Sequence, residues 1–469
     1  MTKIKNYDVV IIGAGLGGLV CGCYLAKKGL DVLIVEKNFQ PGGYCTSFKR
    51  KNFKFDACAH SLGGFRQGGI LRKLFDDLDL VNEIRLNRHT PSDIIVTPDF
   101  KINFDADSNK TIREFQRCFP DESKNISSFF NFLSNSSNES LFKLRYKPFK
   151  VVLDEFFKNN KLKSILSFPL LGNAGLPSSL ISSFSATLLY REFLLDGGYY
   201  PEGGMQSLSN NLAKKFIECG GNLLLSNSVS KIVIKDKKAV GVEFAKGNFV
   251  TAKHVVSNCD AMQTFFSLIE NCHVGHLLKR QLRKMIPSLS MFILYLGLSK
   301  NTNVKLPACS NIWYLPYYNV EKMYRSAKRR KAKNLAEFMI RVLPEKRSLM
   351  VFVNANFENH DYWEKAKDEM TSVLIDKARS LIDDLSGHVV FKEAATPYTL
   401  FKWTQNYEGA AYGWASMPRQ VFVSNFMKKA FFSNLYLVGH WTTVAHGIRG
   451  VVYNGLAISD LILKKEKKR

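Results

Sequence analysis

Three glycines near the start of the chain, Gly13, Gly15 and Gly18, stand at the spacing G-x-G-x-x-G. Between a strand and a helix this spacing suits a pyrophosphate: the first glycine makes a tight turn, the second lets the backbone approach the phosphates, and the third allows close helix–strand contact. The carboxylate of Glu36, further along, can accept hydrogen bonds from a ribose diol. Together these residues predict a site for a dinucleotide whose adenosine ribose carries no phosphate.

The residues around the glycines predict the strand–turn–helix–strand unit that such a site needs. Residues 8–12 are rich in valine and isoleucine and favour a short buried strand that ends at Gly13. Residues 16–28 have a helical pattern with many small side chains, and Gly29 favours a stop. Residues 31–36 favour a second strand. The N-terminus of the helix would present free N–H groups and the positive end of its dipole to the phosphates.

The same stretch raises an alternative, because residues 9–26 are almost wholly apolar and could suggest a membrane-spanning helix. Lys27, Lys28 and Asp31 lie in the middle of the unit and argue against a span. The sequence also shows no basic segment followed by a short apolar core and a small-residue cleavage site, so we expect no secretion signal. The nucleotide site is the favoured hypothesis.

Length and composition bound the fold. The 469 residues are too many for one compact core and predict two domains. Apolar residues make up 46% and aromatic residues 12%, which is typical of a globular protein. The nine cysteines show no C-x-x-C pair and no metal-ligand spacing, so we expect neither a disulfide framework nor a metal site, and a reduced, cytoplasmic setting.

The formal net charge of +25 comes partly from basic clusters at residues 277–285, 325–333 and 464–469. Such clusters occur on ordinary solvated surfaces, and they can also hold anionic lipid or nucleic acid. No zinc spacing, aromatic RNA-binding signature or helix-turn-helix pattern accompanies the charge. We therefore expect no nucleic-acid partner.

The residues that follow the glycine unit carry a family resemblance. Residues 41–64 read PGGYCTSFKRKNFKFDACAHSLGG. The order of glycine turn, Glu-Lys pair, Gly-Gly doublet and FDACAH resembles the flavoprotein superfamily of amine oxidases and phytoene desaturases. Within it, GGYCTSF is more similar to the carotenoid isomerase and retinol saturase branch. The resemblance implies FAD as the cofactor. Many relatives have arginine where this chain has Tyr44, and Lys49 or Arg50 is a candidate to replace that charge.

Two later segments strengthen the resemblance. The phrase YPEGGM at residues 200–205 introduces a helix and two strands, and the resemblance implies backbone contacts to adenine at Val229. Near the C-terminus, a strand ends at Gly439 and a helix starts around residues 449–451, so that its positive end can face a flavin. His440 stands where aspartate is common, and residues 444–447 (VAHG) stand where relatives often have a run of glycines.

The pattern and the resemblance give one set of expected FAD-binding residues, and they indicate no catalytic acid or base. The expected FAD-binding residues are Gly13, Ala14, Gly15, Gly17, Gly18, Glu36, Lys37, Gly42, Gly43, His60, Ser61, Val229, Gly439, His440 and Val451.

The expected fold is α/β, with a Rossmann-type FAD-binding domain interleaved with a substrate domain made of a mixed sheet and helices. We expect the FAD-binding domain to contain residues 1–85, 200–262 and 400–469, and the substrate-binding domain to contain residues 86–199 and 263–399. Residues 288–299 and 349–357 favour strands of the mixed sheet. Residues 156–195 favour apolar helices broken by proline and glycine. They could wall a hydrophobic tunnel, touch a bilayer surface, or form a buried helical subdomain.

The resemblance implies an FAD-dependent oxidoreductase acting on an apolar polyene or isoprenoid, such as a carotenoid or retinoid, by desaturation, saturation or cis–trans isomerisation. Without a second dinucleotide fingerprint, electrons are expected to pass to or from a diffusible partner such as a quinone, oxygen or a nicotinamide. A flavin amine oxidase and a non-catalytic prenyl-binding protein of the Rab GDP-dissociation inhibitor type remain alternatives. An apolar substrate and the basic clusters favour a cytoplasmic enzyme attached peripherally to a membrane surface.

Overall fold

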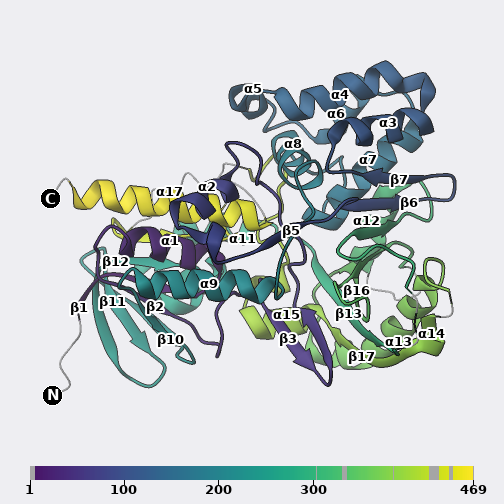
Figure 1. Ribbon diagram of the computed structural model, residues 1–469. Coiled ribbons are helices and arrows are strands. Elements are labelled where there is room, and N and C mark those ends of the chain that lie inside the picture. Colours follow the sequence, from purple (N-terminus) through teal and green to yellow (C-terminus); the bar gives the residue numbers. More distant parts are fainter. Residues whose placement is uncertain are drawn as a thin grey trace.

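The computed structural model describes residues 6–300, 302, 304–329, 335–383, 385–421, 432–442 and 447–467. Residues 330–333 and 468–469 of the basic clusters, and residues 444–446 of the C-terminal loop, lie outside the described residues. Figure 1 shows two lobes. The first lobe, at the left, contains one sheet with its helices and both ends of the chain; the second, at the right, contains another sheet with a group of helices above it.

The first lobe is built on a seven-stranded sheet with the order β10-β11-β12-β1-β2-β9, in which β18 also pairs with β12. Strands β9, β2, β1, β12 and β18 are parallel, and β10 and β11 extend the sheet in antiparallel pairing. The prediction of an α/β fold with a Rossmann-type unit is confirmed. The strands are β1 (Asn6–Ile12), β2 (Val32–Val35), β9 (Asn222–Leu224), β10 (Val229–Lys235), β11 (Lys238–Phe244), β12 (Phe249–Ser257) and β18 (Leu435–Leu437).

Three helices pack beside this sheet: α1 (Leu16–Ala26), α9 (Met205–Glu218) and α17 (Gly447–Glu466). Helix α1 packs against both α9 and α17 and shares their core with β1 and β2. All its residues except Tyr24 are buried. A helix enclosed on every side is apolar all round, which explains why residues 9–26 look like a membrane span. The predicted strand and helix of the glycine unit are confirmed, with Lys27 as the C-cap of α1.

The second lobe is built on a mixed seven-stranded sheet with the order β17-β13-β16-β15-β14-β6-β7, mixed because β14 and β6 pair in parallel. Alternate side chains of β13 enter two different cores, and every residue of β13 and β16 is buried. The strands expected at residues 288–299 and 349–357 are confirmed. The strands are β6 (Asp93–Val96), β7 (Lys101–Phe104), β13 (Ser290–Leu298), β14 (Asn311–Tyr314), β15 (Phe338–Val342), β16 (Ser348–Ala355) and β17 (Val389–Ala395).

Residues 156–195 belong to the helices that cover one face of the second sheet (Figure 1). The apolar side chains of α7, such as Leu162, Ile165 and Leu171, are buried. This burial supports the hypothesis of a buried helical subdomain and disfavours bilayer contact through this segment. The helices are α3 (Ser108–Cys118), α4 (Ser123–Asn135), α5 (Asn138–Lys143), α6 (Phe149–Phe156), α7 (Asn160–Ala174), α8 (Ser183–Leu189), the π-helical turn η3 (Tyr190–Leu194) and α12 (Val320–Arg329).

The other elements connect the lobes or cover their outer faces. They include β3 (Ser47–Arg50), β4 (Phe53–Asp56), α2 (Ile70–Asp77), β5 (Leu86–Arg88), β8 (Tyr199–Pro201), α10 (Ala261–Gln263), α11 (His276–Lys284), α13 (His360–Ala378), α14 (Leu385–His388) and α15 (Pro397–Thr404).

None of the helices in the described part of the chain combines the length and apolar character needed to cross a membrane.

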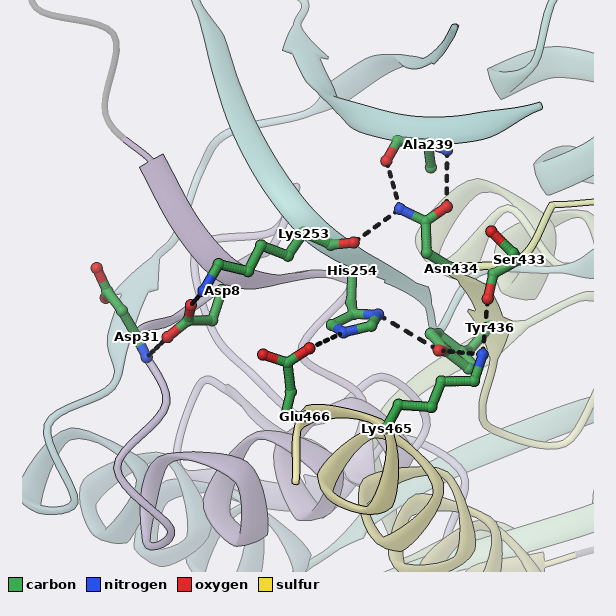
Figure 2. Close-up of polar contacts among 10 residues, drawn as sticks. All are labelled: Asp8, Asp31, Ala239, Lys253, His254, Ser433, Asn434, Tyr436, Lys465 and Glu466. Atoms are coloured by element: carbon green, nitrogen blue, oxygen red, sulfur yellow. Dashed lines mark hydrogen bonds and ion pairs between the residues drawn. The ribbon is translucent and has the colours of Figure 1, made fainter. Parts of the chain in front are cut away.

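The C-terminal end of α17 is fixed to the first sheet by polar contacts, shown in Figure 2. The ring of His254, on β12, is buried; its Nε2 lies 2.9 Å from Oε1 of Glu466, and its Nδ1 lies 3.3 Å from the hydroxyl of Tyr436. The Nζ of Lys465 donates to the same hydroxyl at 3.0 Å. Because these contacts hold the far end of the helix, the position of its first turn is fixed as well.

Candidate active site

A cavity of about 330 Å³ lies at the carboxyl ends of the parallel strands of the first sheet and extends to α7, α8 and β13. Residues that end or follow β1, β2, β12 and β18 line it, which is where ligands bind in open α/β sheets. The structure brings together nearly all of the expected FAD-binding residues. Lining the cavity are Gly13, Gly15, Gly17, Glu36, Lys37, Gly42, Gly43, His60, Ser61, Val229, Gly439, His440 and Val451, whereas Ala14 and Gly18 lie behind its wall.

The glycine turn has little space for side chains. Gly13 has a φ of +98°, a conformation that favours glycine. A Cβ atom on Gly18 would lie 2.2 Å from the carbonyl oxygen of Gly13, so this glycine allows α1 to contact β1. A Cβ atom on Gly17 would lie 2.9 Å from the backbone nitrogen of Gly439. Because these glycines have no side chains, the backbone of the turn can face the cavity. Gly15 is also the N-cap residue of α1.

Glu36 lies at the end of β2 and is only 6% exposed. Its Oε2 accepts a hydrogen bond from the backbone N–H of Ala14 at 2.8 Å, and its Oε1 accepts one from the N–H of Asn38 at 2.9 Å. Burial raises the pKa of this carboxyl, and the two N–H donors oppose that rise. A carboxylate has about four acceptor positions, so Glu36 keeps acceptors for ribose hydroxyls.

The Gly-Gly doublet closes over the glycine turn. Gly42 and Gly43 have φ values of +125° and +62°, and Gly42 pairs with Gly15 in an isolated bridge. Next to them, Tyr44 packs near the ring of His440, with ring centroids 5.8 Å apart. The two residues that were candidates to replace the missing arginine do not reach the cavity. Neither Lys49 nor Arg50 lines the cavity, and the Nε of Arg50 pairs with Glu393 at 3.0 Å.

The C-terminal segment brings a helix N-terminus to the cavity. Gly439 and His440 follow β18, and Ile448, Arg449 and Val451 line the wall from the first turn of α17. The N-terminal end of a helix carries a partial positive charge. Negative charge that develops on a ligand in the cavity is therefore stabilised from this side.

His60 stays neutral in this cavity. Burial, and then the positive charge of Arg341, lower the pKa of its imidazole to about 3. Its ring packs 5.0 Å from the ring of Phe352. At neutral pH the imidazole is uncharged, so it can donate one hydrogen bond and accept another, but it cannot act as a cationic acid.

The part of the cavity nearest the second lobe is mainly apolar. It contains side chains from α7 and α8, from β13 and from the segment before β18. These apolar lining residues are Ala174, Ile181, Leu188, Leu189, Phe193, Met291 and Ala411, with Tyr412 beside them. The expectation that residues 156–195 could wall a hydrophobic space is thus met by α7, α8 and η3.

Sequence reasoning missed several cavity residues. Asn258 follows β12, and its Nδ2 donates to the carbonyl oxygen of Gly13 at 3.3 Å. Its position directly after a strand predicted to be buried could have indicated that it belongs to the ligand site, because ligands bind at the carboxyl ends of parallel strands. Glu192 and Arg449 also line the wall, but nothing in the local sequence places them together. Among the described residues, the set of side chains close enough to share a metal ion is Glu270, Cys272 and His273, which is exposed and outside the cavity.

The residues present fit FAD. The glycine turn exposes backbone at a helix N-terminus, where side chains are excluded and a pyrophosphate is favoured. Glu36 keeps acceptors at the end of the second strand, and a second helix N-terminus reaches the far side of the same cavity. Glu36 itself is held in place by the backbone N–H groups of Ala14 and Asn38.

Comparison with known proteins agrees with this fit. The family model "Flavin containing amine oxidoreductase" matches residues 16–463. Prolycopene isomerase 2 of an Oncidium hybrid cultivar is 26% identical, over 97% of this chain and 83% of that protein. The all-trans-retinol 13,14-reductase of Danio rerio is 24% identical, over 98% of this chain and 86% of that protein.

Solved structures share the fold. An oxidoreductase from Methanosarcina mazei superposes with a TM-score of 0.66 at 18% identity, covering 96% of this chain and 99% of its own. Putrescine oxidase bound to putrescine also gives a TM-score of 0.66, at 15% identity, covering 98% and 99%. The chain belongs to the flavin-containing amine oxidoreductase family and is an FAD-dependent oxidoreductase.

Proposed function

We propose that this oxidoreductase acts on an apolar polyene or isoprenoid, by desaturation, saturation or cis–trans isomerisation. The observation that carries the proposal is the apolar wall formed by α7, α8, η3 and β13 in the same cavity as the glycine turn. Burial of a hydrocarbon chain there is favoured by roughly 25 cal/mol for each Å² removed from water. The relatives named as prolycopene isomerase and all-trans-retinol 13,14-reductase support the same substrate class.

We assign the FAD-binding role to residues 1–85, 200–262 and 400–469 and the substrate-binding role to residues 86–199 and 263–399. In this assignment Gly13, Gly15 and Gly17 bind the pyrophosphate, and Glu36 binds the adenosine ribose. Val229 contacts the adenine. Gly42 and Gly43 would cover the pyrophosphate at the glycine turn. The flavin would be surrounded by His60, Ser61, Gly439, His440 and Val451. FAD supplies the hydride and two-electron chemistry that these side chains lack.

The side chains contribute position and electrostatics. The apolar wall excludes water from the reacting carbons, and the first turn of α17 stabilises negative charge on its side of the cavity. His60 offers one hydrogen bond without adding charge. Desaturation or saturation changes the substrate by two electrons and two protons, so it needs a diffusible electron acceptor or donor. Isomerisation needs no net electron transfer.

Amine oxidation is the second candidate, because putrescine oxidase shares the fold. The side-chain charges disfavour it. The buried carboxylate of Glu192 would be a natural partner for a cationic amine, but it already lies 2.6 Å from Nη2 of Arg66 and 3.9 Å from Nε of Arg449. A cationic substrate would meet two arginines at this wall. A non-catalytic prenyl carrier is disfavoured by the intact glycine turn and by membership of the enzyme family.

The test is turnover by the FAD-loaded enzyme. All-trans-retinol, all-trans-retinoate, a poly-cis carotene and phytoene are presented in liposomes, with the flavin oxidised or chemically reduced, and products are separated by chromatography. Conversion of at least one of these polyenes supports the proposal. If none of them is converted and putrescine bleaches the flavin absorbance, the protein is an amine oxidase instead.

We further propose that the enzyme takes this substrate from a membrane surface. Because α7 is buried, we assign the contact with the membrane to helices α5 and α6 and the loop between them. There Phe142, Tyr146 and Val151 are 42%, 58% and 37% exposed, and the guanidinium of Arg145 lies over both aromatic rings, at 3.8 and 4.2 Å. Lysines 143, 147 and 150 are exposed beside them. Exposed aromatic residues flanked by basic residues suit an anionic lipid surface.

This surface is held next to the cavity, since Ser182 and Ser183, before and at the start of α8, donate to the carbonyl oxygens of Arg145 and Lys147. Sedimentation with liposomes measures the contact. Binding should rise with the anionic lipid content and fall in high salt. The double variant Phe142→Ala/Tyr146→Ala should bind less, and Ile217→Ala, an exposed apolar residue on α9, is its control. Equal binding of both variants would contradict the assignment of this surface.

A further inference from the structure

Three charged side chains meet at one wall of the cavity that is otherwise mainly apolar: Arg66, Glu192 and Arg449. We call them the charged triad. Glu192 and Arg449 line the cavity, whereas Arg66 lies toward solvent, with 42% of its side chain exposed. The triad thus places charge beside the apolar part of the cavity.

Glu192 is the centre of the triad. Its side chain is 4% exposed, and its Oε1 lies 2.6 Å from Nη2 of Arg66. It stands in the π-helical turn η3, between the apolar lining residues Leu189 and Phe193. Single π-helical turns often occur at functional sites. Here the turn contains a carboxylate among apolar lining residues.

Arg449 faces the same carboxylate from the first turn of α17, with its Nε 3.9 Å from Oε2 of Glu192. At this distance the two groups attract each other but are not hydrogen-bonded. Among the described residues, the buried Nε of Arg449 and Oε2 of Glu192 have no hydrogen-bond partner. Burial, with repulsion from Arg66, lowers the pKa of Arg449, but a guanidinium remains protonated.

The charges of the triad do not cancel, because two guanidinium groups share one carboxylate. A structural ion pair would need only Arg66 and Glu192, which already form a hydrogen bond. Arg449 adds a positive charge that no further carboxylate of the described residues neutralises. Although 27% of the Arg449 side chain is exposed, its Nε is buried, and a buried donor without a partner is costly unless a ligand completes it. Arg191 and Asp196 also interact with the triad, but they are opposite in charge, so one surplus positive charge remains. It matches one negative charge on a ligand.

We propose that the charged triad binds the carboxylate of an apolar substrate, so that this enzyme selects polyene or isoprenoid chains that end in an acid. The inference rests on the function proposed above and narrows it. The hydrocarbon chain lies along the apolar wall, and the acid lies at Arg449. Arginine suits this role, since its planar group binds a carboxylate through two parallel hydrogen bonds.

The test compares two probes that differ only at one end: all-trans-retinoate, and axerophthene, in which a methyl group replaces the carboxylate. Binding to the FAD-loaded enzyme is measured from the shift in polyene absorbance and the quenching of protein fluorescence. We expect retinoate to bind roughly ten- to a hundredfold more tightly, the usual effect of a hydrogen bond to a charged group. In Arg449→Gln this preference should disappear while the affinity for axerophthene stays the same. Arg449→Lys, which keeps the charge, should retain part of the preference.

Arg72→Gln is the matched control, because Arg72 is an exposed arginine on α2 that pairs with Asp76 outside the cavity. It should keep the full preference. FAD affinity is measured in parallel for each variant. Equal binding of both probes to the wild type would overturn the inference and leave the proposed substrate class intact. Loss of FAD affinity in Arg449→Gln, with the preference unchanged, would assign Arg449 to the flavin instead. Failure of both probes to bind would count against the proposed function itself.

Discussion

At the scale of single residues, Gly15 and Gly18 show how one residue type serves two purposes in one turn. A Cβ atom on Gly15 would lie 2.7 Å from Nδ2 of Asn258, the movable end of a side chain, on the cavity side. A Cβ atom on Gly18 would meet the backbone oxygen of Gly13 at 2.2 Å, which only a shift of the helix or strand can relieve. The absence of a side chain at Gly15 therefore leaves space for a ligand, whereas its absence at Gly18 lets the helix pack against the strand.

Alanine substitutions should therefore separate the two roles. Gly15→Ala should fold normally and lose at least about tenfold in FAD affinity, or about 1.4 kcal/mol. Gly18→Ala should lower the free energy of unfolding of the apoprotein by about 1–3 kcal/mol, as overpacking usually does. Denaturant unfolding and flavin fluorescence titration measure the two effects. If both variants lost stability equally, the assignment of Gly15 to the ligand would be wrong.

Glu36 allows a second prediction at this scale. In Glu36→Gln the amide oxygen can still accept the hydrogen bond from Ala14, but the charge and the acceptor for the N–H of Asn38 are lost. We expect FAD to bind more weakly by roughly 1–3 kcal/mol, the range for hydrogen bonds to a charged group, while the apoprotein stays folded. Glu218→Gln, at the exposed end of α9, is the control. Unchanged FAD affinity in Glu36→Gln would show that another residue holds the ribose.

Residues close together in the sequence were the predictable ones. The glycine turn, Glu36 and the doublet lie within one stretch, so local spacing was enough to indicate their chemistry. Asn258, Glu192 and Arg449 come from three distant segments and meet only because of the way the chain folds. Glutamate or arginine alone in an apolar helix gives no such signal, because its usual place is a solvated face.

At the scale of elements, α7 depends on a missing side chain. Gly172 packs against Trp313 of β14, and a Cβ atom there would lie 1.9 Å from Cζ3 of the indole. The indole cannot move freely, because its Nε1 donates to Oδ1 of Asp93 at 2.8 Å. Asn173 and Ala174, which follow in the helix, line the cavity. The contact between α7 and β14 therefore sets the position of one cavity wall.

Gly172→Ala should destabilise the protein by about 1–3 kcal/mol through overpacking and weaken polyene binding by moving the wall. The sign of the change in the free energy of unfolding distinguishes overpacking from an effect on helix propensity, because replacing glycine by alanine within an exposed helix stabilises a protein by about 1 kcal/mol. Chemical denaturation gives the free energy of unfolding. A more stable Gly172→Ala variant would mean that α7 packs on β14 less closely than the structure indicates.

The predictable elements were those with a strong local pattern. Strands β13 and β16 were expected because each contains an apolar run, from Met291 to Leu296 and from Leu349 to Val353. The parallel pairing of β14 with β6 was not, because Asn311 of β14 meets Asp93 of β6 across a long stretch of chain. Such pairing is decided by the burial of both strands in one sheet, and the sequence of either strand does not show its partner.

At the scale of the whole molecule, buried polar groups connect the two lobes. Arg341 of β15 is fully buried, and its guanidinium carbon lies 5.3 Å from the ring of Tyr200. The hydroxyl of Tyr200 donates to Oδ2 of Asp56 at 2.7 Å. Burial lowers the pKa of His60 in the cavity wall, and the charge of Arg341 lowers it further. The contacts between the lobes thus help to fix their geometry and also help to keep a cavity residue neutral.

Buried acids should make the stability of the whole molecule depend on pH. Glu337, next to β15, is 3% exposed, and neither carboxylate oxygen has a hydrogen-bond partner among the described residues. Burial raises its pKa from 4.5 to about 7. The folded state therefore favours the protonated acid. This contribution to stability is fully present below about pH 4.5 and is lost as the pH rises through about 7.

Glu337→Gln keeps this position neutral at every pH. The free energy of unfolding of the variant should therefore rise relative to that of the wild type as the pH increases. The difference in free energy of unfolding should widen by about 1.4 kcal/mol for each pH unit between 4.5 and 7, and then level off. Asp260, whose pKa burial raises to about 7, is present in both proteins, so its effect cancels in the comparison. Calorimetric melting from pH 5 to pH 8 measures the difference. Parallel curves for the two proteins would show that Glu337 is already charged in the folded protein at pH 5, because some group neutralises it there.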